Sequence, residues 1–462
     1  MADSYDMIVL GGGTGGYSCA LRAADLGIKV ALVEKNKVGG TCLHVGCIPT
    51  KALLQAAEVA EHAQTADEYG VNATFQGIDM ERVLSFKQGI VDNNWKGLQG
   101  SLKKRGVEVI YGTGRLKDAK TLVVNTEEGE RTLTADKALV LATGSRPRGL
   151  PVDGAEIDGE KIITSDHALF LDRVPQRPIV IGASAVGMEF ASIWHAYGSE
   201  EVTVVEALPA LVPLEDVDTQ KALTRAVRKA GMKIHVGAKM TGVEKGADGV
   251  RVTLEGDKQL EGDVLMLAIG RGPVTEDMGF EDAGATLDRG FVTVDKYCQA
   301  GPDGLYAVGD IIPTLGLAHA SFQEGFLVAE RVAGQHVTPI DYFGVPKVYY
   351  CHPEIGAVGY TEQQLQDKGV EYDKAMFPFS HNARAAMMRS TGHVKVLAEK
   401  NNGRVLGIHI VGARATDLIA EGQLIYNWEA LPTDVAQFIH AHPTLTEAIG
   451  EAHMQLAGRP LH

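Results

Sequence analysis

The segment 38–51 of the sequence, VGGTCLHVGCIPTK, contains two cysteines five positions apart, Cys42 and Cys47. The whole chain has only five cysteines, which is too few for a disulfide-stapled secreted fold. Two thiols this close in such a chain favour redox chemistry or metal binding. A metal site would need more soft ligands than the neighbouring His44 provides. The pair therefore predicts a redox-active disulfide, with a metal site and two unrelated thiols as alternatives.

The spacing of the two cysteines constrains the backbone between them. In an ideal α-helix, positions five apart lie about 7.5 Å along the axis and about 140° around it. An unstrained disulfide needs Cα atoms roughly 4.4–6.8 Å apart. If the two cysteines are bonded, the chain must therefore leave regular helix between them, which Gly46 permits, while Pro49 suits the first turn of a following helix.

A lysine stands one helical turn after the second cysteine. Lys51 follows Cys47 by four residues, so both side chains would share a helix face. An ammonium group in this place stabilises a nearby thiolate. The alternative is a solvated surface lysine.

Dithiol chemistry also needs a base, and HAHPTLTE (residues 440–447) offers His440 and His442. Histidine transfers protons near neutral pH. Pro443 restricts the backbone of His442 and so helps to fix its direction. A histidine pair that packs in the core or binds a metal is the alternative.

The first segment that could position this chemistry lies at the N-terminus. A short apolar strand at 7–10 runs directly into Gly11-x-Gly13-x-x-Gly16. An amphipathic helix at 17–26 and a second apolar strand follow, and Glu34 ends that strand 18 residues after Gly16. This βαβ pattern is typical of dinucleotide binding, because the glycines let the backbone approach a pyrophosphate and the acid accepts bonds from a ribose.

A second copy of the pattern begins with a strand at 179–181. It reads Gly182-x-Ser184-x-x-Gly187, and Glu206 ends the next strand 19 residues after the last glycine. Ser184 replaces the middle glycine and would either crowd the pyrophosphate or donate a hydrogen bond to it. Residues 207–220 contain no lysine or arginine to bind a 2′-phosphate, so the second site favours NAD over NADP.

Composition restricts the possible partners of the protein. The 462 residues carry a formal net charge of −15, which disfavours binding to nucleic acid or an anionic membrane. No apolar run approaches the roughly 20 residues of a membrane helix. The N-terminus lacks a basic region before its first apolar run, so we expect a cytoplasmic protein without a secretory signal.

The rest of the chain predicts further elements around the two fingerprints. Apolar strands are expected at 138–148, where Thr143-Gly144 follows the apolar run, at 263–273 around Gly270-Arg271, and at 304–310 ending in Asp310. From about residue 342 the pattern changes to antiparallel strands, with a hairpin turn at Asn402-Gly403 and helices around 415–428 and 432–439. The fold class is therefore α/β, with two Rossmann-like domains and a C-terminal α+β domain.

The two fingerprints, the GGTCxxxGCxPxK segment and HPTLTE together resemble the flavoprotein pyridine nucleotide-disulfide oxidoreductases. The resemblance covers essentially the whole chain. It implies an FAD domain at 1–148 that is completed by 273–341, an NAD domain at 149–272, and a dimerisation domain at 342–462. Within the family, the chain most resembles members that oxidise protein-bound dihydrolipoamide to lipoamide and reduce NAD⁺ to NADH.

The resemblance also implies roles for individual residues. Cys42 is similar to the thiol that meets substrate, and Cys47 to the thiol beside the flavin. Lys51 would pair with Glu189 of the second fingerprint region. His442 would be the base, oriented by Glu447, and would serve the partner subunit's active site in a homodimer. The implied FAD contacts are Gly11, Gly13, Gly16, Glu34, Lys35, Thr41, Lys51, Gly114, Thr143, Gly144, Asp310 and Ala318. The implied NAD contacts are Gly182, Ser184, Gly187, Glu189, Glu206 and Gly270.

The implied partners are the lipoyl domains of 2-oxo-acid dehydrogenase or glycine cleavage complexes. Alternatives are a reductase for glutathione disulfide or mercuric ion, and a non-catalytic flavin-binding subunit. The C-terminal HMQLAGRPLH has no cysteine pair, unlike the tail expected of a mercuric reductase. His44 stands where the family resemblance leads us to expect asparagine.

Overall fold

The computed structural model describes residues 3–302 and 304–462 and divides into two compact units. The first unit takes its described residues from Met1–Ala52, Glu81–Arg148 and Gly270–Tyr342. The second takes them from Leu53–Met80, Gly149–Ile269 and Phe343–His462. Each unit combines segments that are far apart in the sequence.

A seven-stranded sheet forms the centre of the first unit, in the order β3-β2-β1-β6-β5-β4 with β19 also paired to β6. Its strands are β1 (Asp3–Leu10), β2 (Val30–Glu34), β3 (Glu108–Tyr111), β4 (Thr113–Asp118), β5 (Thr121–Thr126), β6 (Gly129–Leu141) and β19 (Leu305–Ala307). β1 pairs in parallel with β2 and β6, and Met7, Ile8 and Val9 are fully buried. Successive buried residues are typical of a parallel strand covered on both faces.

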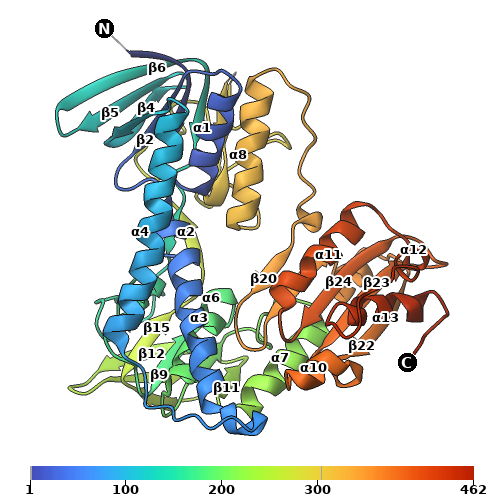
Figure 1. The fold of residues 1–462 in the computed structure, drawn as a ribbon. Helices are drawn as coiled ribbons and strands as arrows, with labels where there is room; N and C mark the ends of the chain where they lie inside the picture. The colour runs from blue at the N-terminus through green and yellow to red at the C-terminus, as the bar shows by residue number, and fades with distance from the viewer. Residues whose placement is uncertain (1–2, 303) are drawn as a thin grey trace. The chain divides into compact units, whose positions relative to one another are not determined.

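Two helices pack side by side in the first unit, α1 (Thr14–Asp25) and α8 (Ala318–Val332) (Figure 1). α1 begins before the expected position 17, because the N–H of Tyr17 already bonds the carbonyl of Gly13. Gly27 follows the helix with a φ of 79°, as expected of a glycine that ends a helix.

The second unit contains a parallel sheet in the order β11-β10-β9-β15-β8. Its elements are β8 (Ile162–Ile163), β9 (Pro178–Ile181), α6 (Ala185–Tyr197), β10 (Thr203–Glu206), α7 (Val217–Lys229), β11 (Lys233–Val236) and β15 (Val264–Leu267). Between β11 and β15 the chain forms an antiparallel sheet of β12 (Met240–Lys245), β13 (Val250–Leu254) and β14 (Lys258–Gly262). The second fingerprint therefore forms a β9-α6-β10 unit, as predicted.

The same unit holds an antiparallel five-stranded sheet in the order β20-β21-β24-β23-β22. Its strands and helices are β20 (Lys347–Tyr349), β21 (Ile355–Gly359), β22 (Tyr372–Pro378), β23 (His393–Glu399), β24 (Val405–Val411), α11 (Ala415–Asn427), α12 (Pro432–Val435) and α13 (Glu447–Leu456). α11 packs on β21 and β24, and α13 packs on β22 and β23. Asn402 has a φ of 58° in the turn between β23 and β24, which confirms the hairpin.

The helix expected at 432–439 is shorter than predicted and ends at Val435. The N–H groups of Gln437 and Phe438 bond carbonyls three residues back, so the α-helical pattern does not continue.

The remaining elements are α2 (Gly40–His44), α3 (Cys47–Gln64), η1 (Ala66–Tyr69), α4 (Met80–Lys104), β7 (Ser145–Pro147), α5 (Ser165–Ala168), β16 (Arg271–Pro273), β17 (Leu287–Asp288), β18 (Phe291–Val292), η2 (Gly309–Ile311), η3 (Tyr342–Gly344), α9 (Glu362–Asp367), η4 (Phe379–His381) and α10 (Ala383–Met387).

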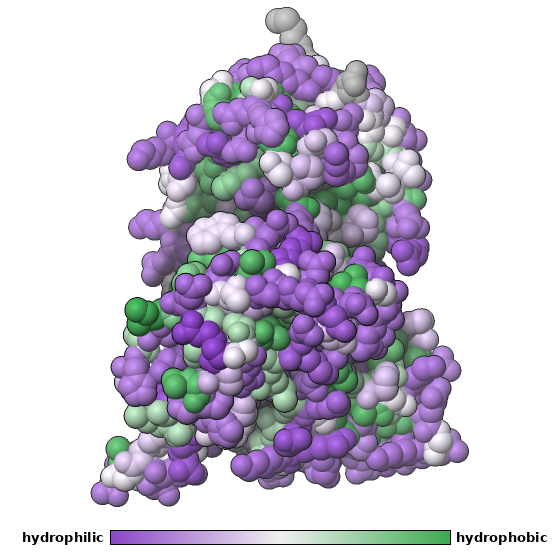
Figure 2. All heavy atoms as spheres, turned by 90° about the vertical axis from the view of Figure 1, so that its right-hand side faces the viewer, coloured by the Kyte–Doolittle hydropathy of each residue, from purple (hydrophilic) through white to green (hydrophobic). Residues whose placement is uncertain are grey.

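The outer face of the molecule drawn in Figure 2 is mostly hydrophilic, with hydrophobic residues scattered in small groups. Among the helices that the structure describes, none has the length and apolar content needed to span a bilayer.

Candidate active site

The two cysteines lie on either side of a break between two helices. α2 ends at His44, Val45 has φ −140° and ψ 28°, and α3 starts at Cys47. A Cβ on Gly46 would lie 2.9 Å from the carbonyl oxygen of Thr41 and 3.3 Å from the Cα of Cys42. Glycine is needed here because the loop passes so close to Cys42. The chain already leaves regular helix between the free thiols, and the prediction for the bonded pair stays a prediction.

The two sulfur atoms interact directly. A hydrogen bond with Cys47 is the largest cause that raises the pKa of the Cys42 thiol, followed by burial and by the charge of Cys47. The charge of Lys51 acts in the opposite direction and lowers that pKa. Two thiols at hydrogen-bonding distance are close to the geometry from which a disulfide forms, and Lys51 stabilises negative charge beside them.

A cavity of about 610 Å³ in the first unit is bordered by Cys42. Its described lining residues are Thr14, Tyr17, Gly39, Cys42, Leu43, Ile48, Asn93, Asn94, Gly97, Leu98, Ser101 and Phe322, and none of these carries a charge. Burial and the charges of Cys42 and Cys47 raise the pKa of Tyr17 to about 12, so its hydroxyl stays neutral beside the sulfurs. The cavity therefore suits a ligand that is uncharged where it meets Cys42.

Backbone hydrogen bonds fix the acid of the first fingerprint. Glu34 accepts the N–H of Gly12 on Oε2 at 2.7 Å and the N–H of Asn36 on Oε1 at 2.8 Å. A Cβ on Gly16 would lie 1.8 Å from the carbonyl oxygen of Gly11, so only glycine allows this approach of helix and strand. Gly13 is the N-cap residue of α1 and provides no side-chain cap.

The second fingerprint repeats these contacts. Glu206 accepts the N–H of Ala183 at 2.8 Å and the N–H of Leu208 at 2.9 Å. A Cβ on Gly187 would lie 1.9 Å from the carbonyl oxygen of Gly182. Both fingerprints therefore present an acid at the same place relative to the glycines.

Ser184 has nearly the same backbone conformation as Gly13, with φ −82° and ψ −166° against φ −73° and ψ −172°. This extended conformation is open to any residue. The Ser184 side chain is exposed and makes no capping hydrogen bond. The serine is thus accommodated without backbone strain.

Asp310 in η2 is held by residues that the sequence did not single out for this role. Ser145 donates to its Oδ2 at 2.5 Å, and Arg271 donates to Ser145. Glu324 accepts the N–H of Gly309, next to Asp310, at 2.7 Å. Burial raises the pKa of Glu324 despite that hydrogen bond. Ser145 and Arg271 both lie in segments expected as strands, 138–148 and 263–273, but the sequence assigned no role to either residue.

The other residues proposed from the resemblance lie as follows. The hydroxyl of Thr143 donates to the carbonyl of Val274 at 2.6 Å, and Lys35 is exposed. A Cβ on Gly114 would lie 2.6 Å from Leu10, so packing alone also explains that glycine. The remaining positions are Gly144 and Gly270, with φ of 74° and 103°, and Ala318, the first residue of α8.

Lys51 belongs to the first unit and Glu189 to the second, and their pairing stays a prediction. Glu189 is buried and accepts the N–H of Tyr350 at 3.1 Å. Lys51 lies on α3 one turn after Cys47, as the spacing predicted.

The expected base forms a pair with its expected partner in the second unit. His442 Nδ1 lies 2.8 Å from Glu447 Oε1, and the other carboxylate oxygen accepts the N–H of Thr444 at 2.7 Å. Burial alone would raise the pKa of Glu447, but the bond from Thr444 and the contact with His442 lower it. The side chain of His442 is 76% exposed, so Nε2 is open to a reaction partner. His440 is bonded to Glu421 instead, at 2.8 Å.

These residues fit FAD in the first fingerprint and NAD in the second. Each fingerprint combines an uncapped helix start with an acid and close glycines. In the first, a Cβ on Gly40 would lie 2.6 Å from the Cα of Gly13. Because Gly40 has no side chain, the segment before Cys42 can pack directly against the glycine loop.

Comparison with known proteins agrees with this geometry. Residues 5–325 match the family model of the pyridine nucleotide-disulphide oxidoreductases, and residues 345–453 match the dimerisation domain of that family. The chain is 38% identical to a dihydrolipoyl dehydrogenase of Bacillus subtilis (strain 168) over the full length of both. It is 39% identical to the mitochondrial dihydrolipoyl dehydrogenase of Pisum sativum, over all of this chain and 93% of that one.

A solved structure has the same fold. LpdA from Mycobacterium tuberculosis superposes with a TM-score of 0.90 at 28% identity, and the match covers 98% of this chain and 100% of that one. The predicted fold class, two dinucleotide-binding folds and a C-terminal dimerisation domain, is confirmed. The chain therefore belongs to the pyridine nucleotide-disulphide oxidoreductases and is an enzyme of that family that uses FAD and NAD.

Proposed function

We propose that the protein oxidises protein-bound dihydrolipoamide to lipoamide and reduces NAD⁺ to NADH. The observation that carries the proposal is the cavity at Cys42, whose described lining has no charged side chain. The lipoamide arm is neutral near its sulfurs, whereas glutathione disulfide carries carboxylates and ammonium groups that need charged partners. Relatives over the full length of the chain bear the name dihydrolipoyl dehydrogenase, which supports the same substrate.

The sulfur chemistry starts from a disulfide between Cys42 and Cys47. His442 removes a proton from the substrate dithiol, and the resulting thiolate attacks Cys42. The bond between the two cysteines breaks, Cys47 leaves as a thiolate, and the substrate is joined to Cys42. The second substrate sulfur then displaces Cys42 and closes the lipoamide ring, and its proton passes to the sulfur of Cys42, which leaves as a thiol. The substrate loses two electrons and the enzyme disulfide gains them.

Residues around these atoms stabilise the charges. Lys51 is placed to stabilise the Cys47 thiolate from one turn along α3. Glu447 accepts from Nδ1 of His442, so Nε2 is the atom that takes the proton. FAD, when bound, supplies the acceptor for the two electrons of the enzyme dithiol, and NAD⁺ supplies the final acceptor.

The preference for NAD rests on Glu206. Two backbone N–H groups fix its carboxylate, and residues 207–220 contain no cation that could pair with a 2′-phosphate. A carboxylate in this place accepts bonds from the ribose and repels the phosphate of NADP.

The assembly follows from the same assignments. The match to the family's dimerisation domain supports a homodimer. We propose that His442 serves the partner subunit's cysteines in it. We propose lipoyl domains of 2-oxo-acid dehydrogenase or glycine cleavage complexes as partners, and the cytoplasm as location.

A substrate panel tests the proposal. Purified holoenzyme is assayed with NADH or NADPH against lipoamide, glutathione disulfide and mercuric ion. We expect lipoamide with NADH to exceed the other pairs in kcat/KM by at least about 100-fold. A higher kcat/KM with glutathione disulfide or mercuric ion would reject the proposed substrate, and equal use of NADPH would reject the role of Glu206.

A further inference from the structure

Arg271 makes polar contacts with two other segments of the first unit. It starts β16, which pairs antiparallel with β7 so that Pro273 lies opposite Ser145. Its Nε donates to the hydroxyl of Ser145 at 2.8 Å, and its Nη2 donates to the carbonyl of Ser145 at 2.8 Å. The same Nη2 lies 3.4 Å from the hydroxyl of Thr41.

The contact to Ser145 continues to a carboxylate. The Ser145 hydroxyl accepts from Arg271 and donates to Asp310 at 2.5 Å. A hydroxyl that both accepts and donates links the guanidinium charge to the carboxylate charge, and hydrogen bonds to charged groups are stronger than neutral ones. Arg271 therefore restrains the side chain of Asp310 through one intermediate residue.

The contact to Thr41 reaches the redox segment. Thr41 precedes Cys42 in the first turn of α2. One guanidinium thus contacts α2 and β7 directly, through Thr41 at 230 positions and Ser145 at 126 positions from Arg271. It reaches η2 through Ser145, which bonds Asp310.

We propose that Arg271 is a positioning residue that holds Thr41 and Asp310 in the places where they contact FAD. The inference rests on the use of FAD in the proposed function, and it takes Thr41 and Asp310 as the flavin contacts that the family resemblance implies. Arginine suits this role since its planar fork donates in several fixed directions at once, whereas a lysine ammonium would satisfy fewer of these acceptors in the required geometry.

The test compares holoenzyme variants. Arg271→Met removes the fork, and Arg271→Lys keeps the charge without it. Arg146→Gln is the matched control, because Arg146 lies on β7 next to Ser145 but is 62% exposed and pairs with the exposed Glu276. FAD affinity is measured by fluorescence titration of the apoprotein, and alkylation of Cys42 by iodoacetamide is followed against pH in NADH-reduced enzyme.

We expect Arg271→Met to weaken FAD binding by about tenfold or more, as the loss of charged hydrogen bonds predicts. Arg271→Lys should bind FAD more tightly than Arg271→Met but more weakly than the wild type. Its alkylation profile should also differ from that of the wild type. Arg146→Gln should stay within about twofold of wild type, as for an exposed ion pair. Wild-type affinity and alkylation in Arg271→Met would overturn the proposal.

A second variant decides the matter if Arg271→Met fails to fold. Ser145→Ala keeps Arg271 but removes its link to Asp310, and it should weaken FAD binding as well; unchanged binding would overturn the proposal. FAD affinity does not depend on the disulfide substrate. Failure of the wild type to reduce lipoamide would therefore reject the proposed function and leave the role of Arg271 intact.

Discussion

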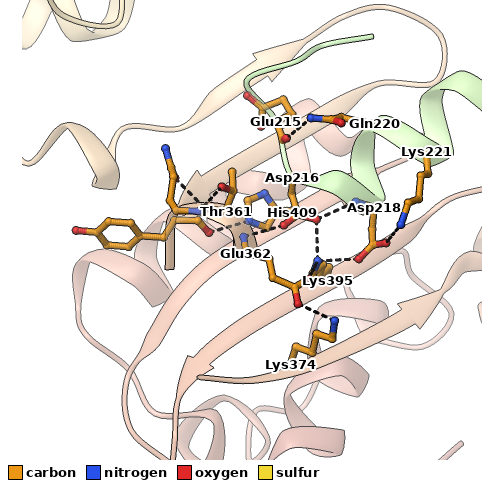
Figure 3. A network of polar contacts seen from close by, with 12 residues as sticks. Glu215, Asp216, Asp218, Gln220, Lys221, Thr361, Glu362, Lys374, Lys395 and His409 are labelled. Atoms are coloured by element: carbon orange, nitrogen blue, oxygen red, sulfur yellow. Dashed lines mark hydrogen bonds and ion pairs between the residues drawn. The ribbon is translucent and has the colours of Figure 1, made fainter. Parts of the chain in front are cut away.

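Replacing Lys395 by methionine tests how strongly one buried cation holds the second unit together. Lys395 comes from β23, its side chain is 1% exposed, and its Nζ lies 2.8 Å from Asp216, 2.7 Å from Asp218 and 2.6 Å from Glu362 (Figure 3). Asp216 also caps α7 by accepting the N–H of Asp218 at 3.0 Å. The cation therefore connects α7, next to the second fingerprint, with the C-terminal sheet.

Removal of one partner from a buried ion pair costs about 3–5 kcal/mol, because the other charge stays buried. The pKa values agree with this size. Burial alone would raise the pKa of Asp216, but His409 and Lys395 lower it from 3.8 to about 2. Burial alone would also raise the pKa of Glu362, but Lys374 and Lys395 lower it from 4.5 to about 2. A shift of about two units corresponds to about 3 kcal/mol, and the two shifts share one cation and are not additive.

The stability that these carboxylates contribute depends on pH in a definite direction. Depressed carboxylate pKa values stabilise the wild type above about pH 4.5, and this contribution is lost as the pH falls toward 2. In Lys395→Met the carboxylates lose the cation that they share and bind protons at higher pH than in the wild type. At pH 7 the free energy of unfolding of Lys395→Met should be about 3–5 kcal/mol below that of the wild type, and this difference should be smaller at pH 4.5.

The assay is reversible urea unfolding followed by circular dichroism at both pH values. Lys221→Met is the matched control, because Lys221 is 67% exposed and lies 3.6 Å from Asp218, so its loss should cost less than about 1 kcal/mol. A deficit for Lys395→Met below about 1 kcal/mol at pH 7 would refute the reasoning. So would a deficit that widens at pH 4.5.

Four further predictions concern the active site. Cys42→Ser should keep FAD and lose lipoamide turnover in a steady-state assay; retained turnover would reject Cys42 as the thiol that meets substrate. Glu447→Gln should lower kcat about tenfold or more, since His442 loses its carboxylate partner, and an unchanged kcat would contradict that role. Ser184→Gly should leave the KM for NAD⁺ within about threefold, because the serine is exposed and unstrained; a tenfold fall would instead show crowding. His44→Asn should lower the free energy of unfolding by about 1 kcal/mol in a urea titration, through loss of the 3.0 Å contact to Val38 and the edge contact to Trp95, and a more stable variant would contradict this account.

The sequence by itself determined the features that depend on neighbours along the chain. The two fingerprints form because glycines, strand, helix and acid follow one another within about thirty residues. The break at Gly46 and the turn from Cys47 to Lys51 follow from helix geometry, and the pair of His442 with Glu447 spans only five positions. Such contacts leave a pattern in the order of residues.

Only the tertiary structure decided the contacts between distant segments. Arg271 reaches Thr41 across 230 positions, and Lys395 reaches Asp216 across 179. The uncharged cavity beside Cys42 combines side chains of α1, α4 and α8 with the cysteine segment. No periodicity marks these residues, because strand pairing and helix packing bring them together only after the local elements have formed. The cysteine pair could thus be singled out from the sequence, whereas the residues that position it and line the cavity beside it could not.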